Sequence, residues 1–170
     1  MRFLTICGST RHESTTARFL AAFAKTYPEH EWVAAPNLSE LPLFTPERLA
    51  AGRPKACTVL AKAVETADTV LIATPEYAHN MPAALKSALE WLVASGEFSR
   101  KPVIAMSCTP HAPRGEYCMK SLVWTLQALD AQVLAEVPVY GFEKHAQQSD
   151  SINEPALREM TDTLMEMVLA

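Results

Sequence analysis

The alternation of apolar strands with amphipathic helices constrains this chain more than any other feature of its sequence. Five segments have the length and composition of buried strands, and they recur about every 30 residues, the length of one βα unit. They are Arg2–Cys7, Glu31–Ala35, Thr69–Thr74, Pro102–Cys108 and Gln132–Val137. The first, third and fourth are nearly continuous apolar runs, a pattern typical of parallel strands that helices cover on both faces.

Segments with helical periodicity follow the strands. They are Ser14–Thr26, Arg53–Thr66, Pro82–Ala94, Gly115–Leu129 and Glu154–Leu169. This alternation predicts a parallel sheet with helices on both sides, and right-handed crossovers leave few possible topologies. We predict an α/β fold, a flavodoxin-like three-layer sandwich whose five-stranded parallel sheet has the order 2-1-3-4-5. Residues 1–170 are expected to form one domain, with a polar loop over Phe142–Asn153.

Composition excludes several classes of partner. The net charge of −4 argues against nucleic-acid and anionic-membrane surfaces, which require a basic face. No apolar run approaches the roughly 20 residues of a transmembrane helix. The four cysteines form no CxxC pair and no zinc spacing, so we expect no metal site. Without a disulfide framework, a reducing compartment is favoured, and the cytoplasm is the expected location.

The loop after the first strand is rich in hydroxyl groups. Ser9, Arg11, Ser14, Thr15 and Thr16 lie where a helix begins and where its first amides have no intrahelical acceptor. Such a helix N-terminus attracts phosphate, and the arginine can add a charge-assisted contact. The simpler alternative is a capped helix after a tight turn. No Walker motif and no GxGxxG fingerprint is present, so the sequence favours a terminal phosphate monoester, as in FMN, over a pyrophosphate.

The loop after the third strand contains two prolines and an aromatic ring. Pro75 stiffens it, Tyr77 offers a flat face, and Pro82 begins the next helix. In the predicted topology this loop lies beside the phosphate loop, at the crevice where such folds bind ligands. A flavin ring needs a shelf of this kind and backbone donors along its edge. The alternative is an ordinary proline-bounded connection with an exposed tyrosine.

These two loops resemble those of the NAD(P)H-dependent FMN reductase family. The resemblance rests on Gly8-Ser9-Thr10-Arg11 with Ser14, on Pro75-Glu76-Tyr77 leading through Pro82 to Leu85-Lys86, and on Leu41-Pro42-Leu43-Phe44. It implies a flavodoxin-like fold, bound FMN, and two-electron reduction of flavins, quinones, azo compounds or metal oxyanions by NADPH or NADH.

By position, the resemblance assigns the FMN phosphate to the loop after the first strand and the isoalloxazine to the loop after the third. The phosphate residues are Ser9, Arg11, Ser14, Thr15 and Thr16, and the ring residues are Pro75, Glu76, Tyr77 and Ala78. The sequence departs from the family pattern at two of these positions. Ala78 stands where the family has an asparagine after Pro-Glu-Tyr, and Thr16 stands where an asparagine is common.

The loop after the fourth strand is expected to form a third wall of the crevice. Thr109, Arg114 and Gly115 are predicted to contact the cofactor, and the resemblance places this loop at the pyrimidine side of the ring. Arg114 either stabilises negative charge on the reduced flavin, contacts a nicotinamide phosphate, or is simply solvated. His79 and His111 fall in crevice loops, where they tune access or acceptor binding or are ordinary surface residues.

Two tryptophans point to self-association. Trp91 and Trp124 fall away from the apolar stripes of their helices, and exposed tryptophans are typical of interfaces. The alternative is that each packs beneath a neighbouring loop. The family resemblance favours a homodimer or homotetramer in which Phe44 caps the partner's flavin.

The expected function is NAD(P)H-driven reduction of a small acceptor by ping-pong hydride transfer. The flavin carries the chemistry, so no catalytic side chain is assigned. Three alternatives remain open: a flavodoxin-type electron carrier, a receiver-like signalling module and a flavin-free relative. A receiver would need a carboxylate at the end of the third strand, where Thr74 and Pro75 stand.

Overall fold

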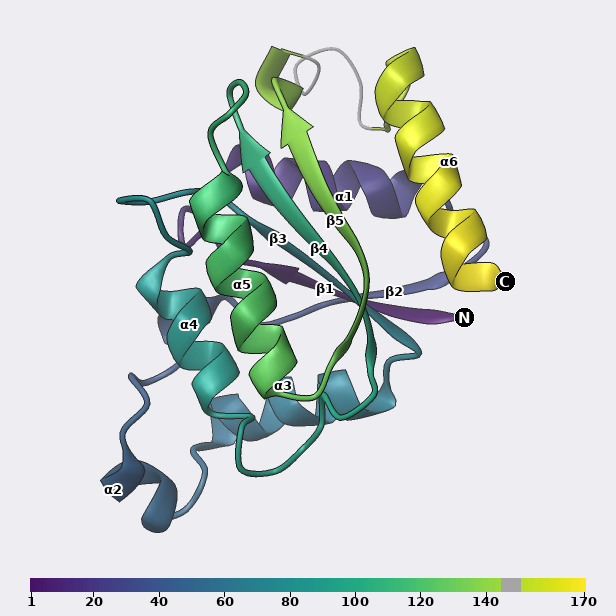
Figure 1. Cartoon of the computed structure of the whole chain (residues 1–170). Helices are drawn as coiled ribbons and strands as arrows, with labels where there is room; N and C mark the ends of the chain where they lie inside the picture. The colour runs from purple at the N-terminus through teal and green to yellow at the C-terminus, as the bar shows by residue number, and fades with distance from the viewer. Residues whose placement is uncertain (145–150) are drawn as a thin grey trace.

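The computed structural model describes residues 1–144 and 151–170. Its sheet has five parallel strands in the order β2-β1-β3-β4-β5, which confirms the predicted fold class and strand order (Figure 1). The strands are β1 (Arg2–Cys7), β2 (Glu31–Ala34), β3 (Thr69–Thr74), β4 (Pro102–Thr109) and β5 (Gln132–Tyr140). Every residue of β3, the central strand, is buried, as expected for a parallel strand covered on both faces.

Helices connect the strands and cover both faces of the sheet. They are α1 (Thr15–Thr26), α2 (Pro46–Ala50), α3 (Lys55–Thr66), α4 (Ala83–Glu90), α5 (Glu116–Ala128) and α6 (Pro155–Leu169), with 3-10 turns η1 (Leu38–Glu40) and η2 (Phe142–Lys144). In Figure 1, α3, α4 and α5 lie on one face, and α1 and α6 lie on the other.

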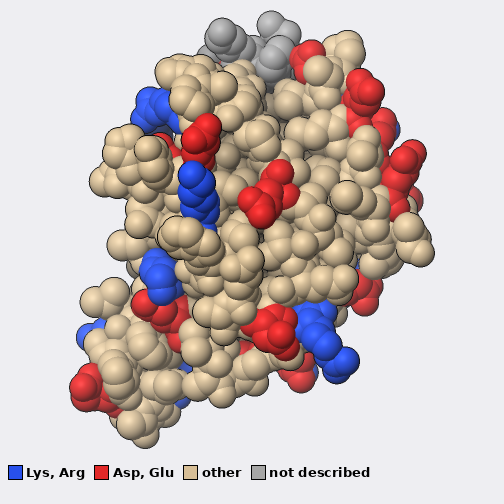
Figure 2. Space-filling model, viewed as in Figure 1, with Lys and Arg blue, Asp and Glu red and all other residues tan. Residues whose placement is uncertain are grey.

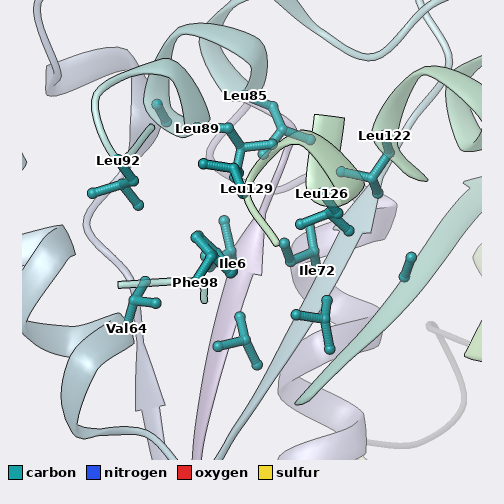
Figure 3. Packing of buried hydrophobic residues seen from close by; sticks show 14 of the residues in the cluster. Ile6, Val64, Ile72, Leu85, Leu89, Leu92, Phe98, Leu122, Leu126 and Leu129 are labelled. Atoms are coloured by element: carbon teal, nitrogen blue, oxygen red, sulfur yellow. The ribbon is translucent and has the colours of Figure 1, made fainter. Parts of the chain in front are cut away.

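Two apolar clusters result, one on each face of the sheet. On the first face, Leu85, Leu89 and Leu122 pack onto Ile6 and Ile72 (Figure 3). The second cluster contains the aromatic side chains of α1 together with apolar side chains of α6. Burial of apolar side chains on both faces stabilises the sheet. Because its strands are parallel, the loops after their carboxyl ends lie at one edge of the sheet.

Three segments depart most from the sequence prediction, and the other predicted strand and helix ends agree with the structure within two residues. Strand β5 continues to Tyr140 instead of ending at Val137, because an edge strand tolerates the missing amide proton of Pro138. Helix α4 ends at Glu90, not at Ala94. The expected loop after Gly141 begins with η2, and Ile152 within it is buried, while residues 145–150 of that loop lie outside the described residues.

The prediction that Trp91 is exposed was wrong. Its side chain is fully buried, its indole Nε1 donates to the Pro42 carbonyl at 2.8 Å, and Phe44 meets it edge to face at 5.3 Å. Helical periodicity identifies only the side of a helix that faces the sheet. The segment after η1 crosses the outer side of α4 and buries Trp91 there. Trp124 is 69% exposed, as predicted.

Candidate functional site

The loops that follow β1, β3 and β4 surround a hollow of about 300 Å³ at the carboxyl end of the sheet. We call it the α1 hollow, because the first residues of α1 form its floor. Its lining residues are Ser9, Arg11, Ser14, Thr15, Thr16, Pro75, Tyr77, Cys108, Thr109, Pro110 and Glu143. The structure therefore brings all five predicted phosphate residues together, along with three predicted to contact the ring or its neighbouring loop.

The N-terminus of α1 opens into this hollow. Ser14 is the N-cap residue, as predicted, and its Oγ accepts from the Ala17 amide at 3.0 Å. Helical geometry leaves the Thr15 and Thr16 amides without intrahelical acceptors. The partial positive charge of a helix N-terminus and nearby hydroxyl groups suit a phosphate dianion.

Arg11 is the charged side chain at the rim of the α1 hollow. Its backbone amide donates to Ser9 Oγ at 3.3 Å, which fixes the turn, while its side chain is exposed. Among the described residues, no carboxylate forms an ion pair with the Arg11 guanidinium. Glu143 also lines the hollow and adds one negative charge that sequence reasoning did not anticipate. A guanidinium without an ion-pair partner is available to an anionic ligand.

The loops after β1 and β3 meet directly. The hydroxyl oxygens of Ser9 and Tyr77 are 3.5 Å apart, so the phosphate loop and the predicted ring loop form one wall. Gly8 makes this approach possible, because a Cβ there would lie 2.8 Å from Thr74 Oγ1. The glycine is required by packing between β1 and β3.

The loop after β3 is a tight, preformed turn. Tyr77 and Asn80 exchange two backbone hydrogen bonds of 2.9 Å each. Between them, Ala78 and His79 have φ angles of 48° and 58°, in the left-handed region that glycine and asparagine favour. Asn80 Oδ1 accepts from the Met81 amide at 2.8 Å and so fixes the turn to the start of α4. The backbone of this loop is held by the protein itself before any ligand binds.

Glu76 faces away from the α1 hollow. Its side chain is only 5% exposed, and Oε2 accepts from the backbone amides of Tyr117 and Cys118 at 3.2 Å each. The carboxylate thus caps α5, whose own N-cap residue, Gly115, has no side chain to do so. Sequence reasoning missed this role, although a glycine before an uncapped helix was the available signal.

The remaining predicted residues line two further hollows. Glu76, Ala78 and Arg114 belong to a hollow of about 240 Å³, here called the α5 hollow, which is completed by His79, Pro113 and Tyr117. Gly115 lies in a third hollow of about 310 Å³ beside Ser107 and the edge strand β5. Thr109 Oγ1 donates to the Arg114 carbonyl at 2.8 Å, which links the α1 hollow to the α5 hollow.

The thiols near the site are protonated. Burial raises the pKa of Cys118 to about 12, and the neighbouring Glu76 carboxylate adds to the rise. Burial also raises the pKa of Cys7 and of Cys108. Because the thiolate is the nucleophile, none of these three cysteines is activated at neutral pH.

No helix in residues 1–144 or 151–170 is both long and apolar enough to cross a bilayer. Within the same ranges, no group of three or more His, Cys, Asp or Glu side chains has the geometry of a metal site. On the face shown in Figure 2, basic and acidic side chains are interspersed.

Comparison with known proteins identifies the family. The sequence pattern of the NADPH-dependent FMN reductase family matches this chain over residues 1–144. The chain belongs to the NADPH-dependent FMN reductase family. FMN as cofactor, NAD(P)H as electron donor and the classification as an oxidoreductase are thereby confirmed.

Individual relatives agree with this assignment. A quinone reductase of Escherichia coli K12 is 30% identical over 138 residues, which cover 79% of this chain and 73% of the relative. An NAD(P)H-dependent FMN reductase of Pseudomonas aeruginosa is 30% identical over 111 residues, which cover 64% of this chain and 60% of the relative. The solved structure of FerB, a flavoenzyme NAD(P)H:(acceptor) oxidoreductase of Paracoccus denitrificans, superimposes with a TM-score of 0.79 at 20% identity and covers 98% of this chain and 94% of FerB. The FerB likeness shows the shared flavodoxin-like fold.

Proposed function

We propose that this protein binds FMN with its phosphate in the α1 hollow and uses NAD(P)H to reduce quinones or free flavins. The observation that carries the proposal is the open N-terminus of α1, surrounded by hydroxyl groups and by Arg11, whose guanidinium pairs with no carboxylate among the described residues. The residues present suit a phosphate monoester, because hydroxyl and amide donors converge where the helix charge is positive. The names of the Escherichia coli and Pseudomonas aeruginosa relatives support quinone and flavin acceptors.

The phosphate loop supplies binding and orientation. Ser9, Ser14 and Thr16 are buried to more than nine-tenths, so their hydroxyl groups are held in place before the ligand arrives. Together with Thr15 and Arg11 they hold the phosphate dianion. Fixing one end of the cofactor in this way reduces the entropy cost of placing its ring at the acceptor site.

The loop after β3 positions the ring. Pro75 and Tyr77 line the α1 hollow, and Ala78 continues this surface toward the α5 hollow. The mutual backbone bonds of Tyr77 and Asn80 keep the shelf rigid. Thr109 lines the opposite wall of the α1 hollow, and Arg114 lies next to it in the α5 hollow, where its guanidinium is available to negative charge on the cofactor or on a substrate.

FMN, when bound, supplies the hydride chemistry between NAD(P)H and the acceptor. The chain contributes binding and orientation, since the cysteines near the site are protonated and unreactive. One open site serves donor and acceptor in turn, which leads us to propose ping-pong kinetics.

An anaerobic spectrum tests the function. The purified protein, reconstituted with FMN, should show oxidised-flavin absorption that NADPH or NADH bleaches and that added benzoquinone restores. Initial rates at several fixed quinone concentrations should give parallel double-reciprocal lines. A flavin that neither nicotinamide bleaches would indicate an electron carrier without its own donor oxidation. Intersecting lines would exclude the shared site.

The organisation of the protein is part of the same proposal. We infer that residues 1–170 act as one FMN-binding domain in the cytoplasm and that the chain forms a homodimer or homotetramer. Trp124 supports self-association, because it lies on α5 and is 69% exposed. Sedimentation should show a mass above that of one chain and a lower mass for Trp124→Glu. A wild-type monomer at micromolar concentration would exclude the oligomer.

A further inference from the structure

The α5 hollow lies on the other side of the β3 loop from the phosphate residues. Pro75 and Tyr77 line the α1 hollow, whereas the intervening Glu76 and the following Ala78 and His79 line the α5 hollow. The turn therefore forms a wall shared by two open spaces. A ligand that rests on this turn can reach both of them.

Arg114 supplies the permanent positive charge in the lining of the α5 hollow. In the described part of the chain, no carboxylate pairs with the Arg114 guanidinium, and the Lys120 ammonium lies over the Tyr117 ring at 5.7 Å. Glu76 is the carboxylate that lines the space, but its Oε2 accepts from two amides of α5 and its side chain is 5% exposed. The accessible permanent charge in the lining is thus the Arg114 guanidinium, while Lys120 lies in the neighbouring third hollow together with Glu116 and Glu136.

Aromatic rings form the rest of the open surface. The rings of His79 and Tyr117 meet edge to face with centroids 5.0 Å apart, and their side chains remain largely exposed, Tyr117 at 56%. His79 is held there by the left-handed turn and by Glu76 Oε1, which lies 3.6 Å from its Nδ1. Flat rings beside a guanidinium suit a planar group that carries negative charge.

We propose that the α5 hollow binds an anionic group attached to an aromatic ring of a substrate, with Arg114 contacting the anion and Tyr117 and His79 contacting the ring. This inference rests on the proposed function and extends it to substrate selection. The same chemistry belongs to two sources, the 2′-phosphorylated adenosine of NADPH and an anionic aromatic acceptor such as a sulfonated naphthoquinone.

Arg114→Ala separates these sources, with Arg18→Ala as the control because it removes the same charge from an exposed position on α1. If the donor binds in the α5 hollow, Arg114→Ala raises the KM for NADPH about tenfold and leaves that for NADH unchanged. If the acceptor binds there, the KM for naphthoquinone sulfonate rises about tenfold, while that for uncharged naphthoquinone does not. Arg18→Ala should change none of these values by more than about twofold.

Calorimetry gives a second measure that does not depend on turnover. Adenosine 2′,5′-bisphosphate and naphthoquinone sulfonate are titrated into the FMN-loaded protein. At least one of them should bind about tenfold more weakly to Arg114→Ala than to Arg18→Ala. Tyr117→Leu keeps an apolar side chain but removes the ring and should weaken the same probe.

Two results would overturn the proposal. The first is equal binding of both probes to Arg114→Ala and Arg18→Ala. The second is a loss confined to FMN affinity, which would make the α5 hollow part of the cofactor site. A protein whose flavin no nicotinamide reduces would contradict the proposed function instead, while the calorimetric comparison would still report on the hollow.

Discussion

Helices α1 and α5 both begin at the carboxyl edge of the sheet, but their N-termini are used differently. At α1, Ser14 caps its own helix and the amides of Thr15 and Thr16 remain open to the hollow. At α5, the N-cap is Gly115, and a carboxylate from another loop accepts from the second and third amides of the helix. One N-terminus is available to an anion from solution, whereas the protein's own Glu76 occupies the other.

This difference shows why a helix N-terminus does not by itself identify a phosphate site. Both helices carry the same partial positive charge at their first turn. At α1, serine and threonine hydroxyl groups line the hollow beside the open amides, whereas the described lining of the α5 hollow contains no serine or threonine and the amides of α5 are already bonded to Glu76. At α5, the internal carboxylate satisfies the helix and fixes the adjacent ring loop at the same time.

Removing the internal cap should have the largest effect. Glu76→Ala leaves two amides of α5 without an acceptor, so we expect the free energy of unfolding to fall by about 3 kcal/mol. Glu76→Gln retains an acceptor oxygen and should lose about 1 kcal/mol. Urea denaturation measures both variants. Equal losses for the two would mean that the charge, and not the hydrogen bonding, holds the loop to the helix.

The open N-terminus is tested through Arg11. Arg11→Ala should weaken FMN binding by about 10- to 30-fold, because one charge-assisted contact to a phosphate is lost. Arg18→Ala removes the same charge from the exposed side of α1 and should change the affinity by less than about threefold. Fluorescence titration of FMN into the apoprotein gives both values. A comparable loss in the two variants would reduce the role of Arg11 to general electrostatics.

The smallest effect is expected at the turn between the two helices. Ala78 has a φ of 48°, which costs an alanine about 1 kcal/mol relative to a residue that tolerates this region. Ala78→Asn should therefore stabilise the protein by about 0.5 kcal/mol, seen as a higher urea midpoint at unchanged slope. Ala83→Asn, at the first residue of α4, is the control and should not stabilise. A destabilised Ala78→Asn would mean that the turn is held by packing that asparagine disturbs.

The structure of the hydroxyl-rich loop after β1, where we propose that the phosphate binds, was predictable because its determinants are local. A serine N-cap, adjacent threonines and an arginine are contiguous in the chain, and the strand that precedes them is an unmistakable apolar run. Alternation and the handedness of crossovers reduced the strand order to a few topologies, and the one that we predicted is the one observed. The helix ends were less well predicted, because local propensity is weak there. Helix α4, for example, ends at Glu90 and not at Ala94.

The sequence by itself determined the alternation of strands and helices and the position of the hydroxyl-rich loop after β1, because both depend on short-range periodicity or neighbouring residues. The tertiary structure decided what Glu76 and Trp91 do. Glu76 meets amides 41 and 42 residues further along the chain, and the indole of Trp91 donates to a carbonyl 49 residues earlier. Such pairings arise only when the sheet brings distant loops together, so no local pattern encodes them.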